Sequence, residues 1–97
     1  MFGPTCDVYS AVHDVEVGDF NYGDKNYRGA LVRYQTALDE KPNDPGILLR
    51  LGKAFEKVGE LEKAREKYEA SITAGPDKPS AKEATAALDR IKAKISK

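Results

Sequence analysis

Apolar side chains recur every three to four residues along most of the chain, which is the spacing of one face of a helix. Leu48, Leu51 and Phe55 mark one such face. A second face follows a few residues later and consists of Leu61, Ala64, Tyr68 and Ile72. The pattern therefore predicts two consecutive helices in the second half of the chain.

Residues that favour helix ends lie on either side of these two faces. Asp44 is a good N-cap, and Pro45 suits the first position of a helix. Gly59 follows the first face as a C-cap, and Gly75 and Pro76 follow the second. These residues predict a helix pair that occupies most of residues 45–75.

The apolar spacing also predicts an earlier helix pair in the first half of the chain. The apolar face of its second helix consists of Tyr27, Leu31, Tyr34 and Leu38. That helix should end before Pro42, and the helix preceding it should run from about Asp7 to Asn21.

The two helix pairs are related by an internal repeat. Six pairs of residues are 34 positions apart: Val17 and Leu51, Gly18 and Gly52, Ala30 and Ala64, Tyr34 and Tyr68, Ala37 and Ser71, and Pro42 and Pro76. A period of this length is typical of a helix–turn–helix repeat. We therefore place repeat one at about 11–44 and repeat two at about 45–78 of a single domain.

Gly18 and Gly52 are expected in the middle of helices, where glycine costs about 1 kcal/mol relative to alanine. Their recurrence in register indicates that two helices approach closely there. Ala30 and Ala64 would be the small residues on the facing helices. On this interpretation Gly52→Leu overpacks the helix pair, whereas Gly52→Ala is mild.

A different pattern begins after Pro79. Ser80 and Glu83 have the spacing of a capping box that opens a helix. The apolar stripe of that helix is narrow and consists of Ala81, Ala84, Leu88, Ile91 and Ile95. A one-sided stripe suits a capping helix over about 79–96 that covers the last repeat. A free coiled-coil strand is the alternative, but the run spans only about two heptads.

Charge and composition narrow the classes of function. Residues 1–44 carry a net charge of −4 and residues 45–97 carry +4, so the 97-residue chain is neutral. Because the basic residues alternate with acidic ones, we expect no nucleic-acid partner. No apolar stretch is long enough for a membrane span, and the first residues do not resemble a signal peptide. We therefore expect no membrane association and a cytoplasmic location, which would not hold if the chain were cut from a longer precursor.

Residues that carry chemistry are sparse. Cys6 is the only cysteine, so no disulfide can form within the chain. His13 is the only histidine, and without a cysteine or serine constellation nearby it is not a catalytic signal. A weak metal pair of His13 and Glu16 is conceivable, but a solvated helix face explains both residues better. No glycine-rich phosphate loop is present. We expect no enzyme activity, no cofactor and no metal.

The chain resembles the tetratricopeptide repeat family. The residues that carry the resemblance in the second unit are Leu48, Leu51, Gly52, Phe55, Gly59, Ala64, Tyr68 and Pro76. The first unit keeps Gly18, Tyr27, Ala30, Tyr34, Ala37, Leu38 and Pro42. It departs from the family at three positions: Asp14 replaces a large apolar residue, Asn21 replaces an aromatic residue, and Lys25 replaces the glycine between the helices. Phe20 and Tyr22 are nearby and could compensate for the missing apolar side chains. The resemblance implies an all-α fold in which antiparallel helix pairs stack into a short right-handed solenoid of about five helices.

The family also implies a site. Its members hold a peptide or a partner helix in a concave groove lined by the first helix of each repeat. The positions carried over to this chain are Val12, Val15, Asp19, Tyr22, Leu49, Lys53 and Glu56. Val12, Val15 and Leu49 are the strongest candidates, because they are apolar and lie off the predicted packing face. Chaperone adaptors of the family grip an acidic C-terminal peptide with a clamp of lysine, arginine and asparagine. This chain has Val15, Asp19, Arg50, Ser80 and Ala84 at those positions, so we do not expect it to be a chaperone adaptor.

The sequence therefore favours a non-catalytic module or scaffold that binds another protein. The alternative is a structural, self-assembling module, such as a piece of a larger complex. A weak homodimer through the first helix is also expected. Val8, Tyr9, Val12 and Val15 would leave an apolar face there, and the two oppositely charged halves would attract each other between chains.

Overall fold

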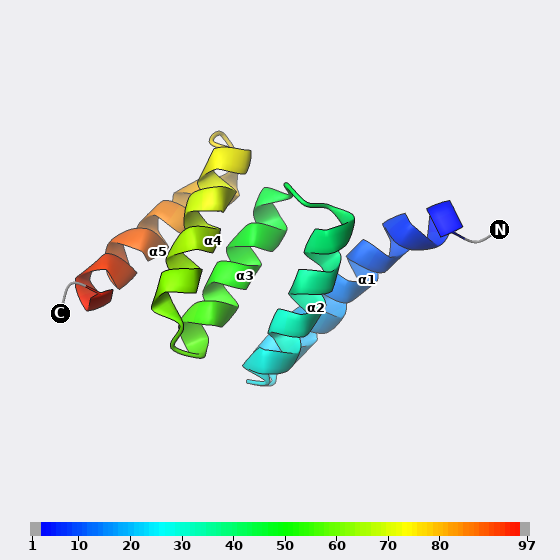
Figure 1. Ribbon diagram of the computed structural model, residues 1–97, viewed down its shortest axis with the longest axis horizontal. Coiled ribbons are helices and arrows are strands. Elements are labelled where there is room, and N and C mark those ends of the chain that lie inside the picture. Colours follow the sequence, from blue (N-terminus) through cyan, green and yellow to red (C-terminus); the bar gives the residue numbers. More distant parts are fainter. Residues whose placement is uncertain (1–2, 96–97) are drawn as a thin grey trace.

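The computed structural model describes the backbone of residues 3–95 and the side chains of residues 11–95. The described chain forms five helices and no strand, as predicted (Figure 1). The helices are α1 (Gly3–Gly23), α2 (Tyr27–Glu40), α3 (Pro45–Lys57), α4 (Leu61–Ala74) and α5 (Pro79–Ile95). Helix α1 is longer than predicted at both ends. The expected contribution of Val8 and Tyr9 to an apolar face lies outside the described side chains.

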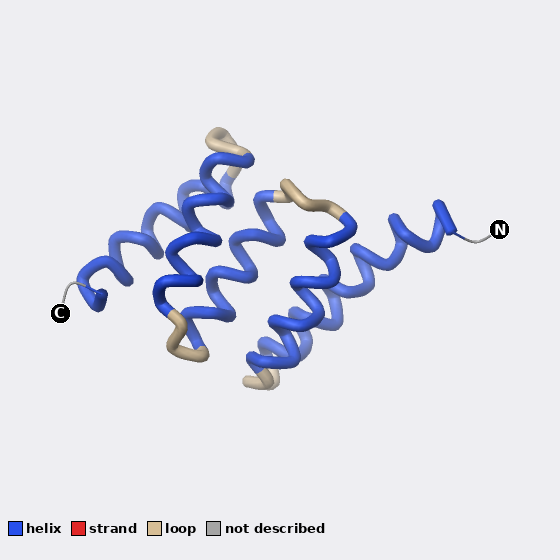
Figure 2. Tube along the Cα trace, in the orientation of Figure 1, coloured by secondary structure: helices blue, strands red, loops and turns tan. Residues whose placement is uncertain are grey.

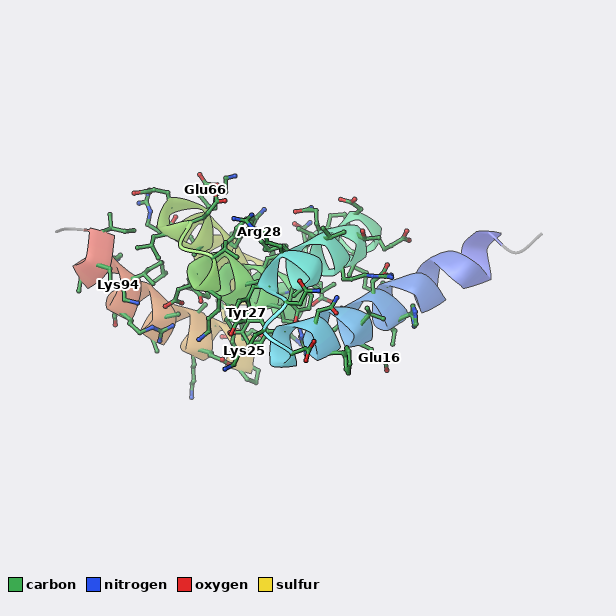
Figure 3. The ribbon with its side chains drawn as sticks, turned by 90° about the horizontal axis from the view of Figure 1, so that it is seen from below. Glu16, Lys25, Tyr27, Arg28, Glu66 and Lys94 are labelled. Carbon is green, nitrogen blue, oxygen red and sulfur yellow. The ribbon has the colours of Figure 1, made fainter. Side chains whose placement is uncertain are left out.

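Consecutive helices pack against one another in antiparallel pairs, and short loops join them (Figure 2). Helices α1, α3 and α5 form one layer, and α2 and α4 form the other (Figure 1). Arg28 on α2 and Glu66 on α4 therefore lie on one side of the molecule, and Glu16 on α1 lies on the other (Figure 3). The result is an elongated molecule of 52 × 30 × 17 Å.

Asp44 caps α3 as predicted. Its carboxylate accepts hydrogen bonds from the backbone N–H groups of Gly46 and Ile47 at 2.9 and 3.2 Å. The capping box predicted for α5 is wrong, because the helix already begins at Pro79 and Ser80 lies inside its first turn. Proline suits a first helical position, since it has no N–H to leave unsatisfied there.

The turns inside the two helix pairs have the same backbone geometry. Gly59 has a φ of +86°, in the left-handed region that glycine adopts without steric cost. Lys25, the equivalent position of the first repeat, has a φ of +65°. The first turn thus keeps the shape of the second without the glycine that favours it.

The first helix pair has an ion pair at the position where the sequence analysis found Asp14 in place of a large apolar residue. Asp14 is buried, and its Oδ1 lies 2.8 Å from Nη1 of Arg33 on α2. The compensation expected from Phe20 is wrong, because 73% of this residue is exposed. Tyr22, by contrast, packs partly buried against the core.

The core consists of two clusters. The first lies between the two helix pairs and contains Ala30, Tyr34, Ala37, Leu38, Ile47, Leu48, Leu51 and Ala54. The second lies under α5 and contains Leu49, Ala64, Tyr68, Ala84, Ala87, Leu88 and Ile91. Helix α5 therefore covers the second helix pair with its apolar stripe, although Ile95 at its end is only half-buried.

The close approach predicted at Gly18 and Gly52 is present, but the partner is a tyrosine ring. A Cβ atom on Gly52 would lie 2.6 Å from Cε1 of Tyr68, and one on Gly18 would lie 2.5 Å from Cε1 of Tyr34. The atoms nearest to a Cβ on Gly52 are thus those of Tyr68. Since these rings are buried and cannot move freely, we now expect alanine at Gly52 to cost more than the mild effect predicted from the sequence.

Candidate functional site

Two adjacent hollows lie along the layer of α1, α3 and α5. The first has a volume of about 480 Å³ and is lined by Asp19, Tyr22, Gly23, Tyr34, Leu49, Arg50, Lys53, Pro79, Ser80 and Glu83. The second has a volume of about 420 Å³ and is lined by Tyr22, Lys53, Glu56, Lys57, Arg90 and Lys94. Because both include Tyr22 and Lys53, we treat them as one groove with a first and a second hollow.

The groove contains five of the seven residues that the sequence analysis selected: Asp19, Tyr22, Leu49, Lys53 and Glu56. Val12 and Val15 are not among the lining residues. Val12 is half-exposed nearer the start of α1, and Val15 packs against the first core cluster.

Leu49 differs from the expectation in its surroundings. It is only 8% exposed and belongs to the cluster under α5, so the prediction that it lies off the packing face was wrong. Val15 and Leu49 occupy equivalent positions of the two repeats, and both pack against the core. Leu49 therefore contributes only a small apolar area to the lining of the first hollow.

Two tyrosine hydroxyls from the other layer hold carboxylates of the groove lining. The ring of Tyr34 crosses Gly18 and its hydroxyl donates to Asp19, while Tyr68 crosses Gly52 and donates to Oε1 of Glu56 at 2.8 Å. Burial, and next the hydrogen bond to the carboxylate, raises the pKa of both tyrosines above the ordinary value of 10.0. Both hydroxyls therefore remain proton donors that hold an acidic side chain in place.

Glu56 joins three helices. Besides the hydroxyl of Tyr68 on α4, its carboxylate accepts hydrogen bonds from Nε and Nη2 of Arg90 on α5, at 3.0 and 2.8 Å. Lys94 Nζ lies 3.8 Å away. Burial alone would raise the pKa of Glu56, but the hydrogen bonds from Arg90 and Tyr68 outweigh it and hold the pKa below its ordinary value. Glu56 is thus a charged structural link at the wall of the groove.

An aromatic pair lies where α1, α2 and α3 meet. The rings of Tyr22 and Tyr27 are 5.2 Å apart and arranged edge to face. Lys53 Nζ lies 5.9 Å from the Tyr22 centroid, and Lys57 Nζ lies 6.0 Å from that of Tyr27. Ammonium groups at this distance are attracted to the ring faces, which keeps these two lysines close to the groove.

The groove residues that sequence reasoning missed are mostly on α5. The prediction treated this helix only as a cap, although Glu83, Arg90 and Lys94 are seven and four residues apart and so share one face. The polar face next to the apolar stripe was the signal that could have identified them. Helix α5 therefore supplies a wall of the groove as well as covering the core.

Comparison with known proteins supports the fold and gives a general role. A search of curated proteins finds no matching sequence. Within the described residues, every helix is too short or too polar to cross a membrane. The tetratricopeptide repeat family model matches residues 22–94. Such repeats generally mediate protein–protein interactions and are typically non-catalytic. The chain is therefore a member of the tetratricopeptide repeat family.

Proposed function

We propose that this chain is a non-catalytic binding module that holds a peptide or a helix of a partner protein in the groove along α1, α3 and α5. The two adjacent hollows give this surface length, and its lining comes mostly from these three helices, with Tyr34 added from α2. Ion pairs and buried tyrosines fix much of the lining before a partner arrives. Binding to a preformed surface costs less free energy than binding that must first order it.

The observation that carries this proposal is the position of Tyr22. It is the aromatic residue shared by both hollows, and it is only partly buried. Tyrosine is enriched among residues that dominate binding energy at protein interfaces, because it offers a large apolar area and a hydroxyl together. A partner lying along the groove would pass over this ring.

We further propose that the whole chain is one domain, made of repeat one at about 11–44, repeat two at about 45–78 and the capping helix at about 79–96. Helices α3 and α5 begin at Pro45 and Pro79, one repeat period apart, which agrees with the period read from the sequence. Since the apolar side of α5 is buried on the second core cluster, we assign it to the same folding unit.

The proposal can be tested with a random peptide library displayed on phage, which makes no assumption about the partner's composition. Peptides selected on the immobilised chain are synthesised with a fluorescent label and measured by anisotropy. The variant Tyr22→Ala should weaken binding about tenfold or more. Val32→Ala, an exposed apolar residue on α2 outside the groove lining, should leave it unchanged. Failure to select any peptide that distinguishes the two variants would refute groove binding.

A second candidate function is self-assembly, and one observation favours it. Phe20 stands one repeat period before Ala54, which is fully buried in the cluster between the two helix pairs. In α1 the same position is 73% exposed. A second copy of the chain could cover it, which would give the weak homodimer expected from the sequence.

A further inference from the structure

The two hollows of the groove differ in charge. The first contains two carboxylates, of Asp19 and Glu83, and two cations, of Arg50 and Lys53, which pair at 3.0 and 3.1 Å. The first hollow is therefore neutral. The second hollow shares Lys53, which is already paired with Glu83. Its other charged residues are the three cations of Lys57, Arg90 and Lys94 and the one carboxylate of Glu56, an excess of two positive charges.

The single carboxylate of the second hollow is already fully engaged. Glu56 receives the hydroxyl of Tyr68 and two N–H groups of Arg90, with the ammonium of Lys94 nearby. One negative charge cannot neutralise both Arg90 and Lys94, whose side chains are 53% and 55% exposed. Lys57 adds a third cation beside the Tyr27 ring. These groups retain donors that point toward solvent at one end of the groove.

We propose that the second hollow binds an acidic segment of the partner, with glutamate or aspartate side chains facing Lys57, Arg90 and Lys94 and an adjoining apolar side chain over Tyr22. This inference rests on the proposed function and adds the chemistry of the ligand. Charge-assisted hydrogen bonds to carboxylates are the strongest contacts that lysine and arginine offer. The cations lie on different positions from those that chaperone adaptors use, where this chain has Val15, Ser80 and Ala84.

The distribution of charge favours a peptide over a nucleic acid. A polyanion that ran along the groove would leave the second hollow and meet the carboxylates of Asp19 and Glu83 in the first. The half of the chain that contains α1 and α2 also carries a net charge of −4. A peptide can confine its negative charge to one end, so it fits the charge pattern of both hollows.

The test uses peptides recovered from the random library and their counterparts in which every glutamate and aspartate is replaced by glutamine or asparagine. Recovered peptides should be enriched in acidic residues, and the neutral counterparts should bind about tenfold more weakly, equivalent to about 1.4 kcal/mol. The variant Lys57→Glu/Lys94→Glu should lose binding to a similar extent. Lys82→Glu/Lys92→Glu makes the same change in net charge on α5 outside the groove lining, and should keep most of the affinity.

Thermal melts establish that each variant folds. If Lys57→Glu/Lys94→Glu does not fold, Lys57→Gln/Lys94→Gln takes its place, and the expected loss of affinity for the acidic peptides is then smaller. Peptides that bind at Tyr22 but show no acidic enrichment and tolerate neutral replacement would overturn this inference and leave the proposed function intact. A library that yields no groove-dependent peptide would refute the function itself. Tighter binding of a single-stranded RNA oligonucleotide than of the acidic peptides would overturn the inference in favour of a nucleic acid.

Discussion

At the scale of single residues, two glycines determine how the tyrosines reach the groove. The aromatic rings of Tyr34 and Tyr68 occupy the space that a Cβ atom would need on Gly18 and Gly52. In this position the hydroxyl of Tyr34 meets Asp19 on α1, and that of Tyr68 meets Glu56 on α3. The repeated glycine thus links core packing to the arrangement of the site.

Gly52→Ala should destabilise the chain by about 1–3 kcal/mol, because the new methyl group overpacks against the buried ring of Tyr68. Gly23→Ala is the matched control. No atom lies within 4 Å of a Cβ built on Gly23, so alanine there should be neutral or stabilise by about 0.4–1 kcal/mol. Urea denaturation of the three proteins measures both effects. Equal stability of wild type and Gly52→Ala would contradict the packing described.

Lys25 provides the second prediction at this scale. A left-handed φ of +65° costs a residue with a Cβ atom about 1–2 kcal/mol, and glycine avoids that cost but loses more entropy on folding. Lys25→Gly should therefore raise the free energy of unfolding by about 0.5–1 kcal/mol. The reciprocal change, Gly59→Lys, should lower it by a similar amount. If both substitutions shift the urea midpoint in the same direction, the equivalence of the two turns is wrong.

At the scale of helices, Glu56 connects α3 to both α4 and α5 through Tyr68 and Arg90. Its pKa is lower in the folded chain than its ordinary value of 4.5, so the folded state releases this proton more readily than the unfolded state. The stabilisation is fully present above about pH 5. It is lost as the pH falls through the folded pKa.

Glu56→Gln should therefore be less stable than wild type at neutral pH, and the difference should shrink between about pH 5 and about pH 3. Glu62→Gln serves as the control, since Glu62 forms an exposed ion pair with Arg65 on α4 alone. Thermal melts across this pH range give the comparison. A stability difference that stays constant with pH would show that Glu56 does not act through its charge.

Most helices could be predicted from the sequence because their apolar spacing, caps and repeat period agree with one another. Helix α5 was predicted as a cover for the core, and Leu88 and Ile91 are indeed buried there. Its contribution to the groove was missed, because the sequence analysis read its polar residues only as the solvated outer face of a cap. The shared face of Glu83, Arg90 and Lys94, next to the apolar stripe, was the available signal.

Asp14 shows the other limit of sequence reasoning. A lone acidic residue at an apolar position of the repeat indicates a departure, but its partner Arg33 lies far along the chain on the next helix. Only the packing of α1 on α2 brings the two charges together. The same holds for Arg90 and Glu56, which are distant in sequence and meet across α3 and α5.

At the scale of the whole molecule, the two ends differ. Helix α5 turns a polar face outward, whereas α1 leaves Phe20 exposed at a position that is buried in the next helix pair. We propose that two copies associate weakly through α1, with the halves of net charge −4 and +4 adding attraction at low salt.

Sedimentation velocity should show an apparent mass that rises with concentration, and more steeply at low salt than at high salt. Phe20→Asp should remain monomeric, while Val32→Asp, a comparably exposed apolar position on α2, should behave as wild type. A monomer at high concentration in both buffers would exclude this association.

The central claim is that a partner protein binds along α1, α3 and α5, and amide chemical-shift mapping tests it most directly. The tightest peptide from the random library is titrated into isotope-labelled chain, and the shifted amides are assigned. The groove account predicts the largest shifts around Tyr22, Lys53 and Lys57, with a second group near Arg90. Shifts concentrated instead on α2 and α4, the opposite layer, would contradict it.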